Sequence, residues 1–275
     1  MRKTKGIDVS EHNGVIDWKT VSENVDFVII RAGYGKGHED EKFRDNAKGC
    51  EKYGIPYGAY WFSYATTIEE AEKEAEYCIN LLNQFAPTYP ICFDYEYDSY
   101  EWAVSHTKNI SYDDIANMAK TFLRKVEQAG YYAMIYTNND WLNRCFYKLT
   151  STFDTWLADW GTNKPNRKYG IRQYSSVGRI AGIQGNVDLN STEYNYPVII
   201  KNMKIRKEVA KNVFKASEAL KIKVLNNLPE TWWNTYLEGV NMYLNDKYTS
   251  LDDMRNEGWD SDVVDAFIKA LMDGD

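Results

Sequence analysis

The sequence predicts an α/β fold, a barrel of mainly parallel strands, followed by a small all-α C-terminal module. Short apolar runs rich in β-branched and aromatic residues alternate with amphipathic helical patterns over residues 1–197, which is typical of a parallel sheet. Eight such runs occur, and eight strands are enough to close a barrel. After Pro197 only helical patterns follow.

The expected strands leave room for helices in the first half of the barrel. In chain order the strands are Gly6–Val9, Phe27–Ala32, Tyr57–Phe62, Ile91–Glu96, Tyr132–Thr137, Thr155–Ala158, Gly170–Tyr174 and Val187–Leu189. The expected helices are Trp18–Asn24, Glu41–Tyr53, Ile68–Phe85 and Tyr112–Ala129. Ser111 is a good start for the last helix and Gly130 a good end. Helical patterns thin out after the fifth strand, so the second half of the barrel is expected to be irregular.

Two segments of opposite charge follow the barrel. Residues 198–228 are expected to form a basic helical connector, because eight basic residues stand against two acidic ones between Lys201 and Lys223. Residues 229–275 carry eleven acidic residues against three basic ones and fit three short helices. We expect so small a module to need the connector or a second copy of the chain for stability.

Composition narrows the classes of partner. A net charge of -7 argues against a nucleic-acid partner, which demands a basic face. The aromatic share of 15% suits sugar recognition, because flat rings stack on the apolar faces of sugars, although most aromatic residues fill a core.

The cysteines and the first residues bear on location. The four cysteines show no paired spacing, so free thiols and synthesis in a reducing cytoplasm are expected. Residues 1–5 are basic, but no apolar segment of a signal peptide follows them, and no run is long enough to span a membrane. We therefore expect a start in the cytoplasm, without membrane insertion, and another route of release for any extracellular role.

The sharpest candidate for chemistry is the acidic run at the end of the fourth strand. Asp94 and Glu96 are two positions apart, so along a strand their side chains point to the same side. Barrels of this kind keep their active sites at the carboxyl ends of strands. Repulsion and partial burial raise the pKa of one carboxyl, and a protonated carboxyl beside an ionised one is what glycoside cleavage requires. The alternative is a solvated acidic turn.

Two further acids occupy equivalent places. Asp8 lies on the first expected strand and Asp188 on the last. The first and last strands of a closed barrel are neighbours, so these acids are expected to converge near Asp94 and Glu96. Each acid taken singly is more typical of a hydrogen-bonding residue at a strand end.

Competing site chemistries have weaker support. No metal-ligand spacing relates the histidines, which are His12, His38 and His106. The glycine-rich segment Gly33–Gly37 matches neither dinucleotide nor phosphate-loop spacing. We therefore expect neither a metal nor a cofactor.

A series of motifs runs through residues 5 to about 195. They are Gly6–Ser10, Phe27–Gly35, Tyr57–Ser63, Asp94–Glu96, Tyr136–Asn138, Trp156–Ala158, Gln173–Tyr174 and Val187–Asn190. By these motifs, in this order and spacing, the chain resembles glycoside hydrolase family 25, the Chalaropsis-type lysozymes of bacteria and their phages. The resemblance implies a distorted (β/α)5β3 TIM-like barrel over residues 1–197, which agrees with the thinning of the helices.

The resemblance also implies an activity, hydrolysis of the β-1,4 bond between N-acetylmuramic acid and N-acetylglucosamine in peptidoglycan. Glu96 matches the general acid/base. Asp94 matches the partner acid that orients the substrate's own N-acetyl group as internal nucleophile, a substrate-assisted route. The matching substrate-binding positions are Asp8, Asp188, Tyr60 and Tyr136. The two acids are expected to tune Glu96 and hold the sugar, whereas core packing is the alternative for both tyrosines.

The C-terminal module has a shorter resemblance. Gly258–Asp265 resembles the second half of a cell-wall-binding repeat found in phage lysins, but the first half of that repeat departs from the pattern. The resemblance implies wall binding by the module. The alternative is a homodimer formed through Trp232, Trp233 and Trp259.

Taken together, we expect a phage endolysin for bacterial lysis, stored in the host cytoplasm and released with the help of a holin, to act on the cell wall. An unsecreted bacterial enzyme would have the same sequence features. Two other functions stay open: a non-catalytic glycan-binding protein on a dead barrel, and an enzyme for chitin-like polymers. Retention of all four acids speaks against the first of these.

Overall fold

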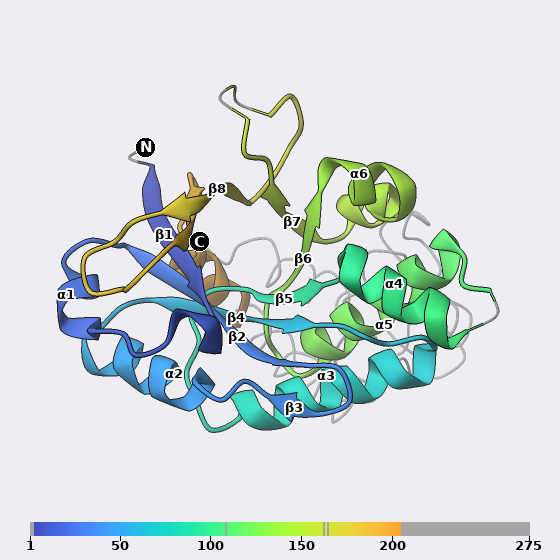
Figure 1. The fold of residues 1–275 in the computed structure, drawn as a ribbon, viewed down its shortest axis with the longest axis horizontal. Helices are drawn as coiled ribbons and strands as arrows, with labels where there is room; N and C mark the ends of the chain where they lie inside the picture. Colours follow the sequence, from blue (N-terminus) through green and yellow to red (C-terminus); the bar gives the residue numbers. More distant parts are fainter. Residues whose placement is uncertain (1–2, 108, 162, 164, 205–275) are drawn as a thin grey trace, which may run out of the picture. The chain divides into compact units, whose positions relative to one another are not determined.

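The computed structural model describes residues 3–107, 109–161, 163 and 165–204 (Figure 1), and residues 1–197 form one compact unit. The barrel strands of this unit are β1 (Thr4–Val9), β2 (Phe27–Tyr34), β4 (Tyr57–Phe62), β5 (Ile91–Asp94), β6 (Ala133–Asn138), β7 (Asp154–Ala158), β8 (Ile171–Gly178) and β9 (Val187–Thr192). All the predicted strands are present, and β4 has the predicted bounds.

The strands close into a ring. From β1 through β2, β4, β5, β6 and β7 to β8, each strand is parallel to the next. β9 completes the ring by pairing antiparallel with both β8 and β1. A two-residue strand, β3 (His38–Glu39), pairs with the end of β2. The carboxyl ends of the parallel strands therefore meet at one end of the barrel, where such barrels place their sites.

Helices accompany the first part of the barrel, and in Figure 1 α2, α3 and α5 lie along one side of the strands. The α-helices are α1 (Trp18–Ser22), α2 (Phe43–Lys52), α3 (Ile68–Leu82), α4 (Tyr97–His106), α5 (Tyr112–Gln128) and α6 (Asn139–Trp141). Short 3-10 or π turns occupy Glu11–Asn13, Leu142–Phe146 and Tyr147–Ser151. Among the described residues, the connections from β7 to β8 and β9 contain no helix. This arrangement confirms the predicted (β/α)5β3 fold class.

The four predicted helices are confirmed as α1, α2, α3 and α5. The start of α5 shows why the sequence signal is reliable. The Ser111 hydroxyl accepts a hydrogen bond from the backbone N–H of Asp114 at 3.1 Å, and the Asp114 carboxylate accepts one from the Ser111 N–H at 2.9 Å. These reciprocal bonds satisfy N–H groups that a helix start leaves unpaired.

Helix α4 has no counterpart in the sequence-based prediction. Its buried residues are Ser99 and Ala103, so the segment lacks the apolar spacing that marks a helix. The predicted strand Ile91–Glu96 is two residues too long, because β5 ends at Asp94 and Glu96 is the cap residue of α4. Glu96 keeps an extended backbone, with φ -124° and ψ -169°. The alternation of side chains therefore continues as far as Glu96.

Side-chain alternation divides the barrel into two packed layers. Outward residues such as Ile7 and Phe93 join helix residues in one core between strands and helices. Residues at alternate positions, such as Ile29, Cys92 and Met134, are fully buried and fill the interior of the barrel. The four cysteines are buried free thiols, as predicted.

Residues 196–204 are helical and include the start of the predicted connector, 198–228. The rest of that connector and the predicted module of residues 229–275 lie outside the described residues. In the part of the chain that the structure describes, no helix has the length and apolar character needed to cross a bilayer.

Candidate active site

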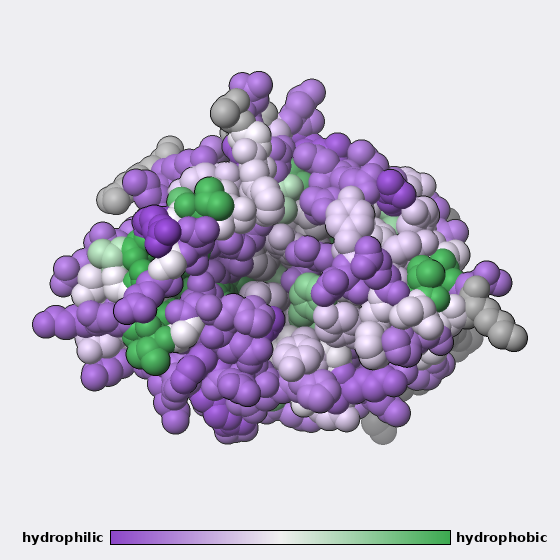
Figure 2. All heavy atoms as spheres, in the orientation of Figure 1, coloured by the Kyte–Doolittle hydropathy of each residue, from purple (hydrophilic) through white to green (hydrophobic). Residues whose placement is uncertain are grey.

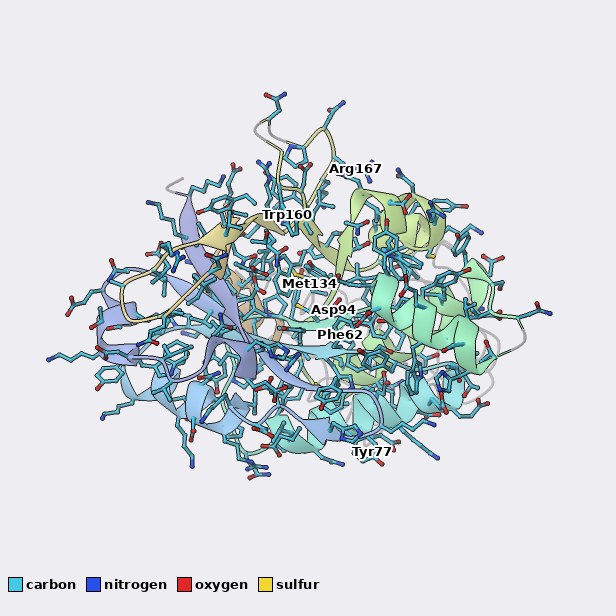
Figure 3. All side chains as sticks on the ribbon, in the orientation of Figure 1. Phe62, Tyr77, Asp94, Met134, Trp160 and Arg167 are labelled. Carbon is cyan, nitrogen blue, oxygen red and sulfur yellow. The ribbon has the colours of Figure 1, made fainter. Side chains whose placement is uncertain are left out.

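A cavity of about 300 Å³ opens among the carboxyl ends of the parallel strands. Figure 3 labels two of its residues, Asp94 and Phe62, near the middle of the barrel, and Figure 2 shows that face hollowed near its centre among mostly hydrophilic side chains. The cavity is lined by Asp8, Val9, Ser10, His12, Asn13, Arg31, Tyr60, Phe62, Asp94, Glu96, Tyr136, Trp156, Gln173 and Asp188. The structure thus brings all six predicted site residues to one cavity.

Asp94 lies at the end of β5 and is 4% exposed. Burial, followed by the charges of Glu96 and Asp8, raises the pKa of Asp94 well above its usual range, and the charge of Arg31 opposes this. Its oxygen Oδ1 is buried and has no hydrogen-bond partner within the described residues. An unpaired buried acceptor costs free energy. Oδ1 is therefore suited to accept a hydrogen bond from a bound molecule.

Glu96 is held through its backbone, whose N–H donates to Ser99 Oγ at 3.2 Å. Burial raises the pKa of the Glu96 carboxyl, and the charges of Asp188 and Asp98 add to this, whereas a hydrogen bond with Tyr136 lowers it. The net effect is a raised pKa. Glu96 therefore keeps its proton to a higher pH than an ordinary glutamate, as a general acid needs to do.

Asp8 and Asp188 are direct partners in the antiparallel register of β1 and β9. Burial, followed by the charge of Asp188, raises the pKa of Asp8 to about 8. Burial also raises the pKa of Asp188, but the hydrogen bond with Asp8 lowers it. Burial and the charge of its partner make full ionisation of both carboxyls costly, so the pair holds a proton to a higher pH than an ordinary aspartate does.

Two amide side chains fix this pair. Gln173 Nε2 donates to Asp8 Oδ2 at 3.2 Å and to Asp188 Oδ2 at 3.1 Å. Asn190 Nδ2 donates to Asp8 Oδ2 at 2.6 Å. The amide oxygens are occupied as well: Gln173 Oε1 accepts from Trp160 Nε1 at 3.1 Å, and Asn190 Oδ1 accepts from Trp156 Nε1 at 2.8 Å. An indole N–H only donates, so these bonds set which end of each amide faces the acids.

An aromatic wall completes the cavity. The ring of Trp156 lies edge-on to Tyr136, with centroids 4.6 Å apart, and to Tyr60, with centroids 5.9 Å apart. The Tyr136 hydroxyl donates to Gln173 Oε1 at 3.1 Å. The same hydroxyl also lies within reach of Glu96, and when its single proton is donated to the Glu96 carboxylate instead, that bond lowers the pKa of Glu96. Both tyrosines therefore pack in the barrel and also line the cavity, so core packing does not exclude a role in substrate binding.

Arg31 supplies a positive charge to the cavity from β2. Its Nε donates to Asp40 at 2.7 Å and its Nη2 to Glu11 at 2.7 Å. The exposed His12 lies beside it, with Nε2 3.3 Å from Arg31 Nη1. Two acids neutralise the guanidinium, and its fixed position lets its charge favour the ionised form of Asp94.

Sequence reasoning did not single out Gln173, Asn190 or Arg31. Each is a polar residue within a strand, at a position that faces into the barrel. That pattern was the available signal, because a buried polar side chain needs a partner within the same interior.

The family model of glycosyl hydrolases family 25 matches residues 7–183, which is more than half of the chain. The chain belongs to glycosyl hydrolase family 25. The family 25 match runs from β1 to beyond β8 and contains Asp8, Asp94 and Glu96. Asp188 lies just past its end, on β9.

Individual relatives agree with this family 25 assignment. The chain is similar to Lysozyme M1 from Streptomyces globisporus, with 28% identity over 203 residues, which cover 68% of this chain and 66% of that protein. It is similar to the structure of the modular autolysin LytC from Streptococcus pneumoniae, with 32% identity and a TM-score of 0.59, over 69% of this chain and 46% of LytC. The chain therefore spans just under two thirds of the curated relative and under half of the autolysin.

A third relative supports the fold alone. The catalytic domain of an endolysin from a bacteriophage of Listeria monocytogenes is 23% identical, with a TM-score of 0.61. The match covers 73% of this chain and 98% of that domain. The family 25 barrel thus matches nearly the full length of that separate domain.

Proposed function

We propose that this chain is a muramidase, which cleaves the β-1,4 bond between N-acetylmuramic acid and N-acetylglucosamine in peptidoglycan. The observation that carries the proposal is Glu96, whose pKa is raised in a cavity shared with Asp94, Asp8 and Asp188. A carboxyl that keeps its proton beside other carboxyls suits glycoside cleavage. Family 25 membership and similarity to Lysozyme M1 support peptidoglycan as the substrate.

In the proposed reaction, Glu96 gives its proton to the glycosidic oxygen while the bond from that oxygen to C1 breaks. The carbonyl oxygen of the substrate's own N-acetyl group forms a bond to C1, which makes a cyclic intermediate. Glu96, now a carboxylate, takes a proton from water as the water oxygen bonds to C1 and the N-acetyl oxygen leaves. Two displacements at C1 retain its configuration.

Asp94 is proposed to orient the N-acetyl group. Its unpartnered Oδ1 is the acceptor for the acetamido N–H, and this bond aims the carbonyl oxygen at C1. The intermediate carries a positive charge that an ionised Asp94 stabilises. Arg31 favours that ionised form, because its charge lowers the pKa of Asp94 against the effect of burial.

The remaining predicted residues are proposed to bind the sugar and to tune the acid. The charge of Asp188 raises the pKa of Glu96, and Gln173 holds Asp188 beside Asp8 by donating to both acids. Tyr60 and Tyr136 present their rings to the same cavity.

The decisive experiment is mass spectrometry of the products from purified Gram-positive peptidoglycan. A muramidase leaves new reducing ends on N-acetylmuramic acid, and Glu96→Gln abolishes their appearance. New ends on N-acetylglucosamine would overturn the proposed bond. Binding without any product would favour the glycan-binding alternative, and faster cleavage of chitin oligomers would favour the chitin-like substrate.

We also propose a lytic role at the wall, as a phage endolysin released from the host cytoplasm through a holin. Similarity to the fold of an endolysin catalytic domain supports this role. Expression in a Gram-positive host tests it: culture lysis is expected with a co-expressed holin and not without one. Lysis at the same rate without the holin would show an independent route to the wall.

The C-terminal residues are proposed to act apart from catalysis. Residues 229–275 would bind the wall, joined to the barrel by residues 198–228, and self-association as a homodimer is the alternative. Sedimentation of the full chain and of residues 1–197 with purified walls separates the two. Unchanged wall binding after truncation would exclude the targeting role, and a change from dimer to monomer would favour self-association.

A further inference from the structure

A second cavity, of about 440 Å³, lies on the outer side of β1, β8 and β9. Three of its residues form a row across β1, β9 and β8: Lys5 is paired with Ser191, and Ser191 with Arg172. The neighbouring residues Gln173 and Asn190 point into the barrel, where they bind Asp8. Because side chains alternate along a strand, the row faces outward. The two cavities therefore share one wall, with the candidate active site on its inner face.

The second cavity is cationic. Lys3 and Lys5 are exposed, and neither forms an ion pair within the described residues. Arg172 is buried and fixed, since its Nε donates to the carbonyl oxygen of Asp159 at 2.9 Å and its guanidinium lies 3.7 Å from the Asp159 carboxylate. The two lysines thus supply the charges that are open to a ligand.

One buried hydroxyl in this cavity lacks a partner. Ser191 is 2% exposed, and its Oγ makes no hydrogen bond to any described residue. It lies on β9, between Lys5 on β1 and Arg172 on β8. A buried polar atom without a partner points to a molecule that supplies one. This observation is independent of the positive charge around it.

Aromatic rings frame the cavity, and one of them links it to the active site. Tyr174 lies under Lys3, whose Nζ is 5.9 Å from the ring centroid. Trp160, labelled in Figure 3 close to where the chain leaves β7, is 58% exposed. Its Nε1 donates to Gln173 Oε1, the amide that holds Asp8 and Asp188. A ligand on Trp160 therefore contacts a side chain that is hydrogen-bonded to Gln173, the residue that holds the acid pair.

We propose that the second cavity binds the carboxylate-bearing peptide that is attached to muramic acid in the substrate strand. This inference rests on the proposed function. Lys3 and Lys5 pair with the peptide carboxylates, Ser191 bonds a peptide polar group, and Trp160 packs against the peptide or its sugar. The link through Trp160 and Gln173 favours a group carried by the same strand that is cut, rather than the phosphates of a separate wall polymer.

Binding of a soluble muramyl peptide to the full chain tests the cavity directly. By calorimetry, Lys3→Gln combined with Lys5→Gln is expected to weaken binding by about tenfold, the effect of two exposed ion pairs. Lys19→Gln combined with Lys48→Gln removes the same charge from exposed positions outside both cavities and is expected to leave the affinity unchanged. Equal affinities for all three proteins would overturn the proposal.

Hydrolysis separates this inference from the proposed function. On strands that carry peptides and lack teichoic acid, the Lys3 and Lys5 variant is expected to show a raised KM with an unchanged kcat. On strands stripped of peptides by an amidase, its KM is expected to equal that of the wild type. A KM raised equally on both substrates, or raised only on walls that retain teichoic acid, would contradict peptide binding. Wild-type protein that binds the muramyl peptide but cuts neither substrate would refute only the proposed function.

Discussion

Two pairs of carboxyl groups line the same cavity, but the structure holds them in different ways. Asp94 and Glu96 come from one short segment, the end of β5 and the cap of α4. Asp8 and Asp188 come from strands at opposite ends of the barrel sequence and meet through the β1 and β9 register. Amide side chains donate two hydrogen bonds to Asp8 Oδ2 and one to Asp188 Oδ2, and we call Asp8 and Asp188 the saturated pair. We call Asp94 and Glu96 the open pair, because Asp94 Oδ1 has no partner within the described residues.

This difference suggests two separate roles, one that acts on Glu96 through charge and one that contacts the substrate. A carboxyl pair held by fixed amide donors has a fixed geometry, and it acts on Glu96 through the charge of Asp188. The pair of Asp94 and Glu96 keeps an acceptor without a partner, Asp94 Oδ1, and is therefore available to a substrate. The largest losses of activity are therefore expected at Glu96 and Asp94, and losses of stability at the Asp8 network.

Glu96→Gln is the strongest test of the open pair. The amide keeps the size of the side chain but has no acidic proton to give, so kcat is expected to fall by about 10²- to 10⁴-fold. Release of reducing ends from purified peptidoglycan measures the fall. Glu101→Gln, on the exposed side of α4, is the matched control and is expected to keep wild-type kcat. Full activity of Glu96→Gln would remove Glu96 from the mechanism.

Asp94→Asn is expected to cost somewhat less, on the order of 10²-fold in kcat, because the amide loses the charge but keeps an oxygen that accepts the acetamido N–H. Peptidoglycan with its N-acetyl groups removed distinguishes orientation of the substrate from simple folding damage. If Asp94 acts through the N-acetyl group, substrate deacetylation and Asp94→Asn give losses that do not add. Fully additive losses would argue against that role.

The fold and the open pair were predictable because they depend on local patterns. The strand and helix periods gave the barrel, and the spacing of Asp94 and Glu96 placed both acids on one side. Helix α4 was not predictable, because it buries little apolar surface and so leaves no helical pattern. The predicted strand ran two residues past the end of β5, but the backbone of Glu96 is extended, so the prediction that Asp94 and Glu96 point to the same side was not affected.

The amide network around Asp8 depends on long-range register, which one sequence does not reveal. Gln173, Asn190 and Trp156 lie on three strands and meet only after the barrel closes. The polarity of Gln173 and Asn190 inside strands could have marked them as interior residues. Their partners could not be assigned without knowing which residues of β8 and β9 stand opposite each other.

Asn190→Ala probes the saturated pair. The substitution leaves Trp156 Nε1 without its acceptor and Asp8 without its shortest hydrogen bond. Stranding buried polar groups costs about 1–3 kcal/mol each, so a loss of about 2–4 kcal/mol in the free energy of unfolding is expected. Urea denaturation measures it. Asn186→Ala, exposed before β9, is expected to change stability by less than about 0.5 kcal/mol. Similar midpoints for the two variants would show that the network adds no stability.

Asp8→Asn tests whether the saturated pair holds a proton, through the pH dependence of the free energy of unfolding. The pKa of Asp8 is about 8 in the folded protein and 3.8 as an ordinary aspartate, so between these values the folded state holds a proton that the unfolded state has lost. The stability from this group is complete below about pH 4 and declines as pH rises towards 8. Asp8→Asn removes the decline, and the variant gains on the wild type as pH rises. Parallel pH profiles of the unfolding free energy would place the proton elsewhere, and Asp45→Asn, exposed on α2, is the control.

Tyr136→Phe sharpens the contrast at the point where the two pairs meet, because the Tyr136 hydroxyl reaches both Gln173 and Glu96. Its hydrogen bond lowers the pKa of Glu96, so its removal raises that pKa and keeps Glu96 protonated to higher pH. The alkaline limb of the pH profile of kcat/KM is expected to move upward, while kcat falls by about 2- to 10-fold through the lost bond. Tyr60→Phe is the control for the limb, since Tyr60 is not among the groups that shift the pKa of Glu96. An alkaline limb that stays in place, or moves down, would show that the Tyr136 hydroxyl serves Gln173 and the saturated pair alone.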